Sequence, residues 1–349
     1  MAEEFLEKEQ YQLTGDDELI IKEAVARGQN ILNIDAEEEL NHFKKMMEWR
    51  RKKKRILWTA AASLIFILGI GGGLLFSKHN PFLRQATIVY EANDSIDGVL
   101  LYVGNKAINL QSDSAGTMVR SHGAVLADNE IIYTEDGKAE SNTLSVPDGK
   151  TYCVTLSDGT IVWINSHSQI TFPSVFTGNE RRITLSGEAY FKVAKDVVHP
   201  FVVESGNVET KVLGTEFNVR NYREEPSNIT LVEGSVQVKT SNHSPVRLLP
   251  GQNMEVSPNG RIDVENVDIR EYVEWKSGFF YFDNKTLTEV FRIIGRYYNV
   301  SVMCSNEKLM NIHFNLWIDM NKPIENNLDL INEVGELHAY KNGNIIIIK

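Results

Sequence analysis

An uncharged apolar segment, Ile56 to Phe76, constrains this chain more than any other feature of its sequence. The segment is 21 residues long and directly follows six basic residues, Arg50 to Arg55. An α-helix rises about 1.5 Å per residue, so a segment of this length can cross the hydrocarbon core of a bilayer, which is about 30 Å thick. Basic residues beside a span stay in the cytoplasm. We therefore expect residues 50–76 to form a basic flank and one transmembrane helix, with the N-terminus inside the cell and the C-terminus outside.

A cleavable signal peptide explains the apolar segment less well. All 55 residues before it would have to belong to the signal, and the segment exceeds the usual apolar core of about 7 to 15 residues. No small-x-small cleavage site follows it. Gly69 and Gly73 have the small-xxx-small spacing that lets two spanning helices approach closely, so a homodimer through the membrane is an open alternative to a lone span.

Residues 1–49 should form a small, acidic, helical head in the cytoplasm. They carry thirteen acidic and five basic residues, which suits a basic partner or a solvated surface equally well. Asp35 and Glu38 have the spacing of a helix cap, and Leu40, Phe43 and Met47 recur along one face of the helix that follows. A head this short buries little surface alone. The apolar face therefore either binds another protein or closes a two-helix hairpin.

Beyond the span, the pattern changes to short β-branched runs separated by turns. Turn dipeptides such as Asp148-Gly149 and Asp158-Gly159 stand between extended segments, and no stretch with helical periodicity occurs between Ala86 and about Val267. We expect a linker and β-rich segment over residues 77–145, followed by an all-β domain over residues 146–267. The net charge of −11 argues against direct nucleic-acid binding by this external body.

The last 75 residues, 275–349, predict a compact α+β domain with the element order β-α-β-β-α-β-β. Thr286 and Glu289 form a capping box that opens one helix, and Pro323 stands at the start of a second. Strands are expected at Phe279–Phe282 and His313–Ile318, and the chain closes with a hairpin around Asn342-Gly343. The two helices should pack against one small sheet.

Cysteine and histidine, the residue types that form disulfides or commonly bind metals, do not indicate a site in this sequence. Cys153 and Cys304 both lie outside the membrane, where a disulfide is chemically allowed, but we expect both to be buried small apolar residues rather than a bridge. The eight histidines are scattered, and none has the spacing of zinc ligands. The sequence therefore predicts no metal and no cofactor.

No set of residues indicates an enzyme that acts on another molecule. Ser166, His167 and Ser168 are adjacent, and neighbouring side chains of an extended chain point to opposite faces, so we interpret them as a polar turn. Glu188 has no second carboxylate at a catalytic spacing, so a structural hydrogen bond or ion pair is the simpler interpretation.

Six short motifs in the β region resemble the FecR family of transmembrane anti-sigma factors, and they stand in the order of that family. They are Leu156–Asn165, Arg182–Val193, His199–Val203, Val212–Val219, Leu231–Val236 and Leu249–Gln252. The terminal α+β unit resembles the domain that follows FecR in Bacteroidetes-type members, which is itself similar to the short signalling (STN-like) domains of secretins and TonB-dependent receptors. The head carries no motif that matches the family residue by residue.

This resemblance implies an inner-membrane signal relay between two partners. The head would bind an extracytoplasmic-function (ECF) sigma factor, with Leu40, Phe43 and Met47 in the binding face. The C-terminal domain would bind the periplasmic signalling domain of a TonB-dependent outer-membrane transducer. The resemblance also implies that the β region is a solenoid-like stack of strands. The alternative is a membrane-anchored periplasmic ligand-binding or assembly module without a sigma partner.

The resemblance further suggests one place where the chain could cut itself. Some relatives are similar to self-cleaving proteins at a step that matches Gly214-Thr215, where the threonine hydroxyl attacks the preceding carbonyl carbon. Glycine allows the strained backbone that such an acyl shift requires. A glycine bulge in an ordinary strand is the other interpretation of the same dipeptide.

Overall fold

The computed structural model describes residues 86–349, apart from 94–97, 105, 128, 136–138, 242 and 334–336. The predicted head, its residues Leu40, Phe43 and Met47, and the apolar segment 56–76 lie outside the described residues. In the part of the chain that is described, no helix is long and apolar enough to cross a bilayer. All that follows concerns the described residues of the unit Pro81–Lys349.

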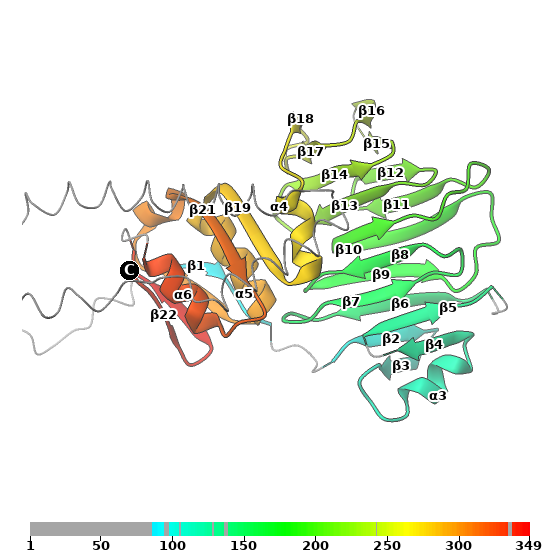
Figure 1. Cartoon of the computed structure of the whole chain (residues 1–349), viewed down its shortest axis with the longest axis horizontal. Coiled ribbons are helices and arrows are strands. Elements are labelled where there is room, and N and C mark those ends of the chain that lie inside the picture. The colour runs from blue at the N-terminus through cyan, green and yellow to red at the C-terminus, as the bar shows by residue number, and fades with distance from the viewer. Residues whose placement is uncertain are drawn as a thin grey trace, which may run out of the picture. The chain divides into compact units, whose positions relative to one another are not determined.

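Two β-sheets make up most of the described chain, and we call them together the β stack (Figure 1). The first sheet contains, in spatial order, β3 (Lys106–Asn109), β2 (Leu100–Val103), β6 (Ser141–Val146), β9 (Ser168–Pro173), β10 (Arg181–Lys192), β11 (Phe201–Ser205), β12 (Val208–Val212), β15 (Val236–Thr240) and β16 (His243–Leu248). The second contains β4 (Ala124–Ala127), β5 (Glu130–Tyr133), β7 (Tyr152–Thr155), β8 (Ile161–Ile164), β10, β13 (Glu216–Asn221), β14 (Ser227–Glu233), β17 (Gln252–Val256) and β18 (Ile262–Asn266).

Strand β10 belongs to both sheets, and Gly187 marks the point where it changes from one to the other. Residues 181–186 pair with β11 and β9 in the first sheet, whereas residues 187–192 pair with β13 in the second. Gly187 has φ +102°, and a Cβ there would lie 2.3 Å from Ser168 Oγ. Only glycine fits such a close approach with this backbone conformation. The chain alternates between the sheets along its whole β region, which is the solenoid-like path that the resemblance implies.

Alternating apolar residues from both sheets form one hydrophobic core. The fully buried members include Leu101, Leu144 and Leu185 from the first sheet, and Val154 and Phe217 from the second. Period-2 alternation places these side chains on one face of each strand, so stacking the two faces buries a continuous core. The prediction of a β domain is correct, with one local exception. Residues Ala115–Arg120 form a short helix, α3, where no helix was expected.

The C-terminal domain follows the predicted element order, from β19 (Phe279–Thr286) to β23. Its other elements are α5 (Leu287–Tyr298), β20 (Ser301–Cys304), η3 (Glu307–Asn311), β21 (His313–Asp319), α6 (Ile324–Asn332), β22 (Ala339–Asn342) and β23 (Ile345–Ile348). The capping box at Thr286 and Glu289 is present. The expectation of one small sheet is wrong. Among the described residues β19 and β21 pair only with each other, and a second sheet has the order β1-β20-β23-β22.

The first strand of the described chain, β1 (Thr87–Tyr90), is part of this C-terminal sheet. The sequence pattern had predicted that these residues belong to the β-rich segment that leads into the β stack. Instead β1 pairs antiparallel with β20, more than two hundred residues later. The chain therefore enters the C-terminal domain first, then builds the β stack, and returns through α4 (Arg270–Val273) and η2 (Glu274–Ser277).

Candidate functional site

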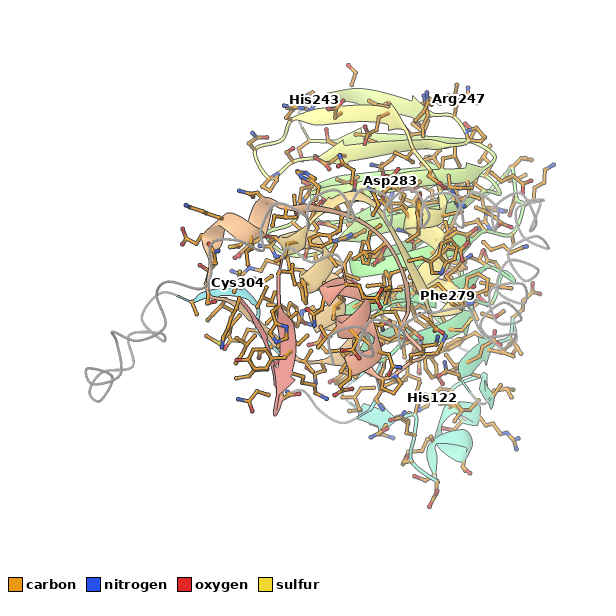
Figure 2. The ribbon with its side chains drawn as sticks, turned by 60° about the vertical axis from the view of Figure 1, so that its left-hand side comes forward. His122, His243, Arg247, Phe279, Asp283 and Cys304 are labelled. Carbon is orange, nitrogen blue, oxygen red and sulfur yellow. The ribbon has the colours of Figure 1, made fainter. Side chains whose placement is uncertain are left out.

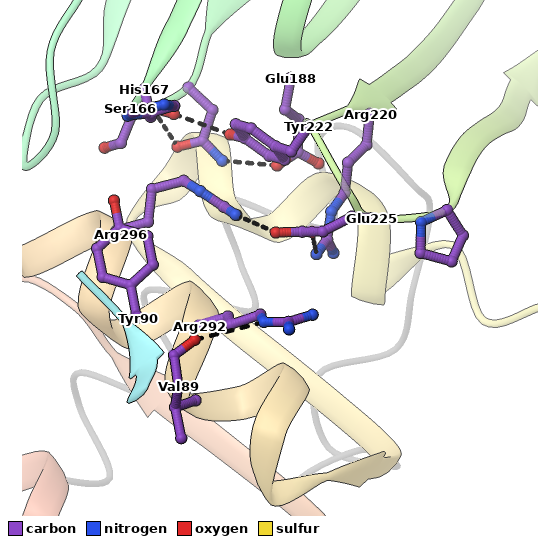
Figure 3. Close-up of polar contacts among 12 residues, drawn as sticks. Val89, Tyr90, Ser166, His167, Glu188, Arg220, Tyr222, Glu225, Arg292 and Arg296 are labelled. Atoms are coloured by element: carbon purple, nitrogen blue, oxygen red, sulfur yellow. Dashed lines mark hydrogen bonds and ion pairs between the residues drawn. The ribbon is translucent and has the colours of Figure 1, made fainter. Parts of the chain in front are cut away.

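Charged residues from the β stack and from the C-terminal domain meet in a buried cluster, which we call the junction (Figure 3). Arg296, near the end of α5, forms an ion pair with Glu225 from the turn between β13 and β14. Arg220 Nη2 donates to the other oxygen of Glu225 at 2.6 Å. The side chains of Arg296 and Glu225 are only 7% and 9% exposed. Each domain therefore buries one charge whose counter-charge is supplied by the other domain.

The balance of charge at the junction depends on Arg220, Glu225 and Arg296. Burial alone would raise the pKa of the Glu225 carboxyl, but the adjacent Arg220 and Arg296 guanidinium groups lower it to about 2. Glu225 is therefore ionised at any physiological pH. Because two cations share one carboxylate, loss of the carboxylate would leave both arginines without their counter-charge.

Aromatic rings complete the junction. The Arg296 guanidinium carbon lies 3.5 Å from the centroid of the Tyr222 ring and 5.9 Å from that of Tyr90. Tyr222 donates its hydroxyl to the Ser166 carbonyl at 2.8 Å. Tyr90 donates to Asp148 Oδ1 at 2.9 Å. A guanidinium stacked on a tyrosine face is stabilised by the ring quadrupole, by about 0.5 to 2 kcal/mol.

Glu188, Ser166 and His167, which we interpreted from the sequence as structural, make hydrogen bonds or turns next to the junction. Glu188 accepts hydrogen bonds from Asn165 Nδ2 at 2.8 Å and from Asn218 Nδ2 at 3.0 Å, as its interpretation as a structural acid predicted. Ser166 and His167 form a bend between β8 and β9, and His167 Nδ1 lies 2.9 Å from Asp148 Oδ1.

The connecting segment η2 also packs on the β stack. Trp275 is buried and donates its indole N–H to Asn218 Oδ1 at 3.3 Å. Lys276 Nζ lies 3.2 Å from the centroid of the Tyr190 ring. Burial lowers the pKa of Lys276 to about 8, although the carboxylates of Glu216 and Glu274 act in the opposite direction. These contacts attach the start of the C-terminal domain to the second sheet.

Gly214 and Thr215 lie where the chain crosses from β12 in the first sheet to β13 in the second. Gly214 has φ +152°, and a Cβ there would lie 2.7 Å from the Lys195 Cα atom. Thr215 is 5% exposed, and its hydroxyl donates to the Ser235 carbonyl at 3.1 Å. The dipeptide is therefore not a bulge inside a strand. It is a crossover between the sheets in which Gly214 is half-buried and Thr215 is buried, and its backbone and surroundings admit only glycine at position 214.

The cysteines and histidines are placed apart from one another. Cys153 lies in β7 and Cys304 in β20, and both are free thiols, as expected. Cys304 is fully buried, as expected, but the expectation that Cys153 is buried is wrong. In β7 the buried side chains are Tyr152 and Val154, and Cys153 between them lies half-buried on the other face of the strand. Figure 2 shows His122 and His243 at opposite ends of the β stack. Among the described residues no three of the His, Cys, Asp and Glu side chains are grouped to hold a metal ion.

The junction was not predicted from the sequence. Arg296 lies about half a helical turn away from Val290, Phe291 and Ile294, on the opposite side of α5, and yet it is buried. A charged residue on the polar side of an amphipathic helix is normally solvated. The burial of Arg296 and its pairing with Glu225 therefore become visible only in the structure.

Comparisons with known proteins agree with this two-domain arrangement. Residues 142–237 match the family model described as FecR protein, and residues 279–348 match that described as FecR, C-terminal. The chain is similar, at 31% identity and a TM-score of 0.56, to a candidate anti-sigma factor from Parabacteroides distasonis ATCC 8503 solved at 1.65 Å resolution. That match covers 59% of this chain and 98% of the other.

A second structure of a candidate anti-sigma factor from the same organism, at 2.50 Å resolution, gives a similar result. Its identity is 30% and its TM-score is 0.55, and the match covers 60% of this chain and 98% of the other. A search of curated proteins found no match.

Proposed function

The chain belongs to the FecR family, and from this premise we propose that it is an anti-sigma factor that regulates an ECF sigma factor. The observation that carries the proposal is the 31% identity to a candidate anti-sigma factor over 98% of that solved chain. The family models match residues 142–237 and 279–348, and the sigma-binding part of the proposal rests on residues 1–49. Their acidic composition and the apolar face at Leu40, Phe43 and Met47 suit a protein-binding head.

The proposed topology is a single-pass protein of the inner membrane. Residues 56–76 have the length and apolar character of a span, and the basic residues 50–55 favour a cytoplasmic head and a periplasmic body. A head in the cytoplasm can meet a sigma factor, and a body in the periplasm can meet an outer-membrane protein.

The proposed external partner is the periplasmic signalling domain of a TonB-dependent transducer, bound by the C-terminal domain. Two small sheets in this domain end in strands with one unpaired side among the described residues. These are β1 and β22 in the four-stranded sheet, and β19 and β21 in the two-stranded sheet. An unpaired strand edge can add a strand from a partner, and the similarity to STN-like domains favours such a partner.

Co-purification from membranes tests the proposed function directly. The full chain, and a chain that ends at Ser277, should both retain an ECF sigma factor encoded near the gene. Only the full chain should release the sigma factor, or change its activity, when the transducer receives its signal. A full chain that binds no sigma factor at micromolar concentration contradicts the regulator proposal and favours the alternative of an anchored periplasmic module. A truncated chain that still responds contradicts the role of the C-terminal domain.

We also propose that Gly214-Thr215 is a self-cleavage step. The glycine-only backbone and the buried hydroxyl support the proposal. In the acyl shift Thr215 Oγ1 would bond to the Gly214 carbonyl carbon as the amide C–N bond breaks, so that an ester and a free amine form, and water would then hydrolyse the ester.

Thr215→Ala is expected to abolish a fragment that ends at residue 214, because it removes the attacking hydroxyl. A blot against an N-terminal tag measures the fragment, and Thr215→Ser should retain it. Thr230→Ala is the matched control, since Thr230 is also buried and donates a similar hydrogen bond, to Asn253 Oδ1 at 2.9 Å. The same fragment in Thr215→Ala would rule out the acyl shift.

A further inference from the structure

Strand β1 is the first strand of the described chain, and it forms one edge of the four-stranded sheet of the C-terminal domain. It has four residues and pairs with β20 on one side, with the pairs Thr87–Cys304, Ile88–Met303 and Tyr90–Val302. The register shifts between Ile88 and Tyr90, so the ladder is interrupted within the strand. Short edge strands with a bulge contribute few ladder hydrogen bonds.

The last residue of β1, Tyr90, contacts both α5 and the β stack, and Figure 3 shows its side chain beside Arg296. Its ring lies against α5 at Gly295, where an added Cβ would be only 2.6 Å from the Tyr90 Cδ1 atom. The same ring lies beside the Arg296 guanidinium. Its hydroxyl donates to Asp148 of the β stack, and burial raises its pKa well above the usual range, with the Asp148 carboxylate adding to the shift. One side chain therefore ties β1 to the C-terminal helix and to the β stack.

The rest of β1 is held more weakly than Tyr90. The Ile88 side chain is 60% exposed. The Thr87 hydroxyl donates to Glu307 at 3.3 Å on the surface, and Arg292 Nε donates to the Val89 carbonyl at 3.4 Å. Val89 is buried, but the other three side chains of β1 are half-buried or exposed. Local opening of such a strand requires much less free energy than unfolding either domain.

We propose that β1 is a releasable clasp, seated by Tyr90 at the junction, which controls whether the chain ahead of the β stack is accessible to a protease. When Tyr90 is seated, residues 87–90 are a paired strand and cannot enter a protease site, which binds its substrate as an extended, unpaired segment. A change in how the C-terminal domain meets the β stack would move Gly295 and Arg296 relative to Asp148 and unseat Tyr90. The proposal rests on the proposed function only for the consequence of cleavage. A cut here would separate the body from the predicted span and head.

Gly295→Ala tests the clasp without altering β1. The added methyl should displace the Tyr90 ring, because the ring atom is too close for a Cβ to fit. We expect chymotrypsin to cut the full chain, in detergent, after Tyr90 at least ten times faster than in the unmodified protein. Gly116→Ala in α3 is the matched control, since it is a helical glycine with open space around it and should leave the rate unchanged. Equal rates for Gly295→Ala and the unmodified protein would overturn the proposal.

A disulfide lock gives a second readout that does not depend on the fold of the Gly295 variant. Thr87 lies directly opposite Cys304, so Thr87→Cys should form a cross-strand disulfide under oxidising conditions. The locked chain should resist the cut after Tyr90 until a reductant is added, and the same variant with Cys304→Ser should show no protection. A cut that is unaffected by oxidation would contradict the clasp. Sigma-factor binding is measured separately, so a failure of the proposed function would be distinguished from a failure of the clasp.

Discussion

Glu225→Ala is expected to lower the free energy of unfolding of the two-domain body (the β stack and the C-terminal domain) by roughly 3 to 5 kcal/mol, which is typical when one partner of a buried ion pair is removed. The carboxylate is shared by Arg220 and Arg296, and both guanidinium groups would lose their counter-charge. Urea denaturation of the purified full chain in detergent measures the change. The C-terminal domain should also separate from the β stack at a lower urea concentration than the β stack itself unfolds.

The neighbouring residue supplies a matched control for this experiment. Glu224 is also a glutamate, but its side chain is 85% exposed, so Glu224→Ala should change the stability by less than about 0.5 kcal/mol. Equal effects of the two substitutions would show that the junction does not hold the domains together.

The same carboxylate predicts the pH dependence of the body. The pKa of Glu225 is about 2 in the folded protein and near 4.5 in the unfolded chain. Since the folded value is the lower one, the stabilisation is fully present above about pH 4.5 and is lost as the pH falls toward 2. Glu225→Gln should therefore show a smaller loss of stability over this interval than the unmodified protein.

Phe43→Asp is expected to weaken binding of the sigma factor roughly 30-fold or more. Binding would bury the new carboxylate against an apolar surface without a partner, and residues at the centre of an interface commonly cost at least about 2 kcal/mol when changed. Titration of the full chain, in detergent, against the labelled sigma factor measures the affinity.

Phe43→Leu serves as the control, because it keeps an apolar side chain and should change the affinity only a few-fold. If Phe43→Asp binds as tightly as the unmodified protein, the apolar face at Leu40, Phe43 and Met47 belongs to the fold of the head or to the membrane surface.

The sequence was sufficient for features that depend on neighbouring residues. The capping box at Thr286 and Glu289, the alternating strands of the β region and the element order of the C-terminal domain all follow from local pattern. The family also followed from the sequence, because its six motifs lie in continuous stretches. Gly214-Thr215 was also identified from the sequence, but its position at a crossover between the two sheets was not.

Only the tertiary structure decided which distant residues meet. Tyr90 and Asp148 are 58 positions apart, and Glu225 and Arg296 are 71 apart, yet each pair bonds at the junction. The assignment of β1 to the C-terminal sheet has the same character, since a four-residue extended run can pair with any exposed strand edge of suitable register. Periodicity and capping record how a segment folds with its neighbours in sequence. Pairing across the fold is selected by the burial of the whole core and by the need of each buried charge for a partner, and neither is a local property of the chain.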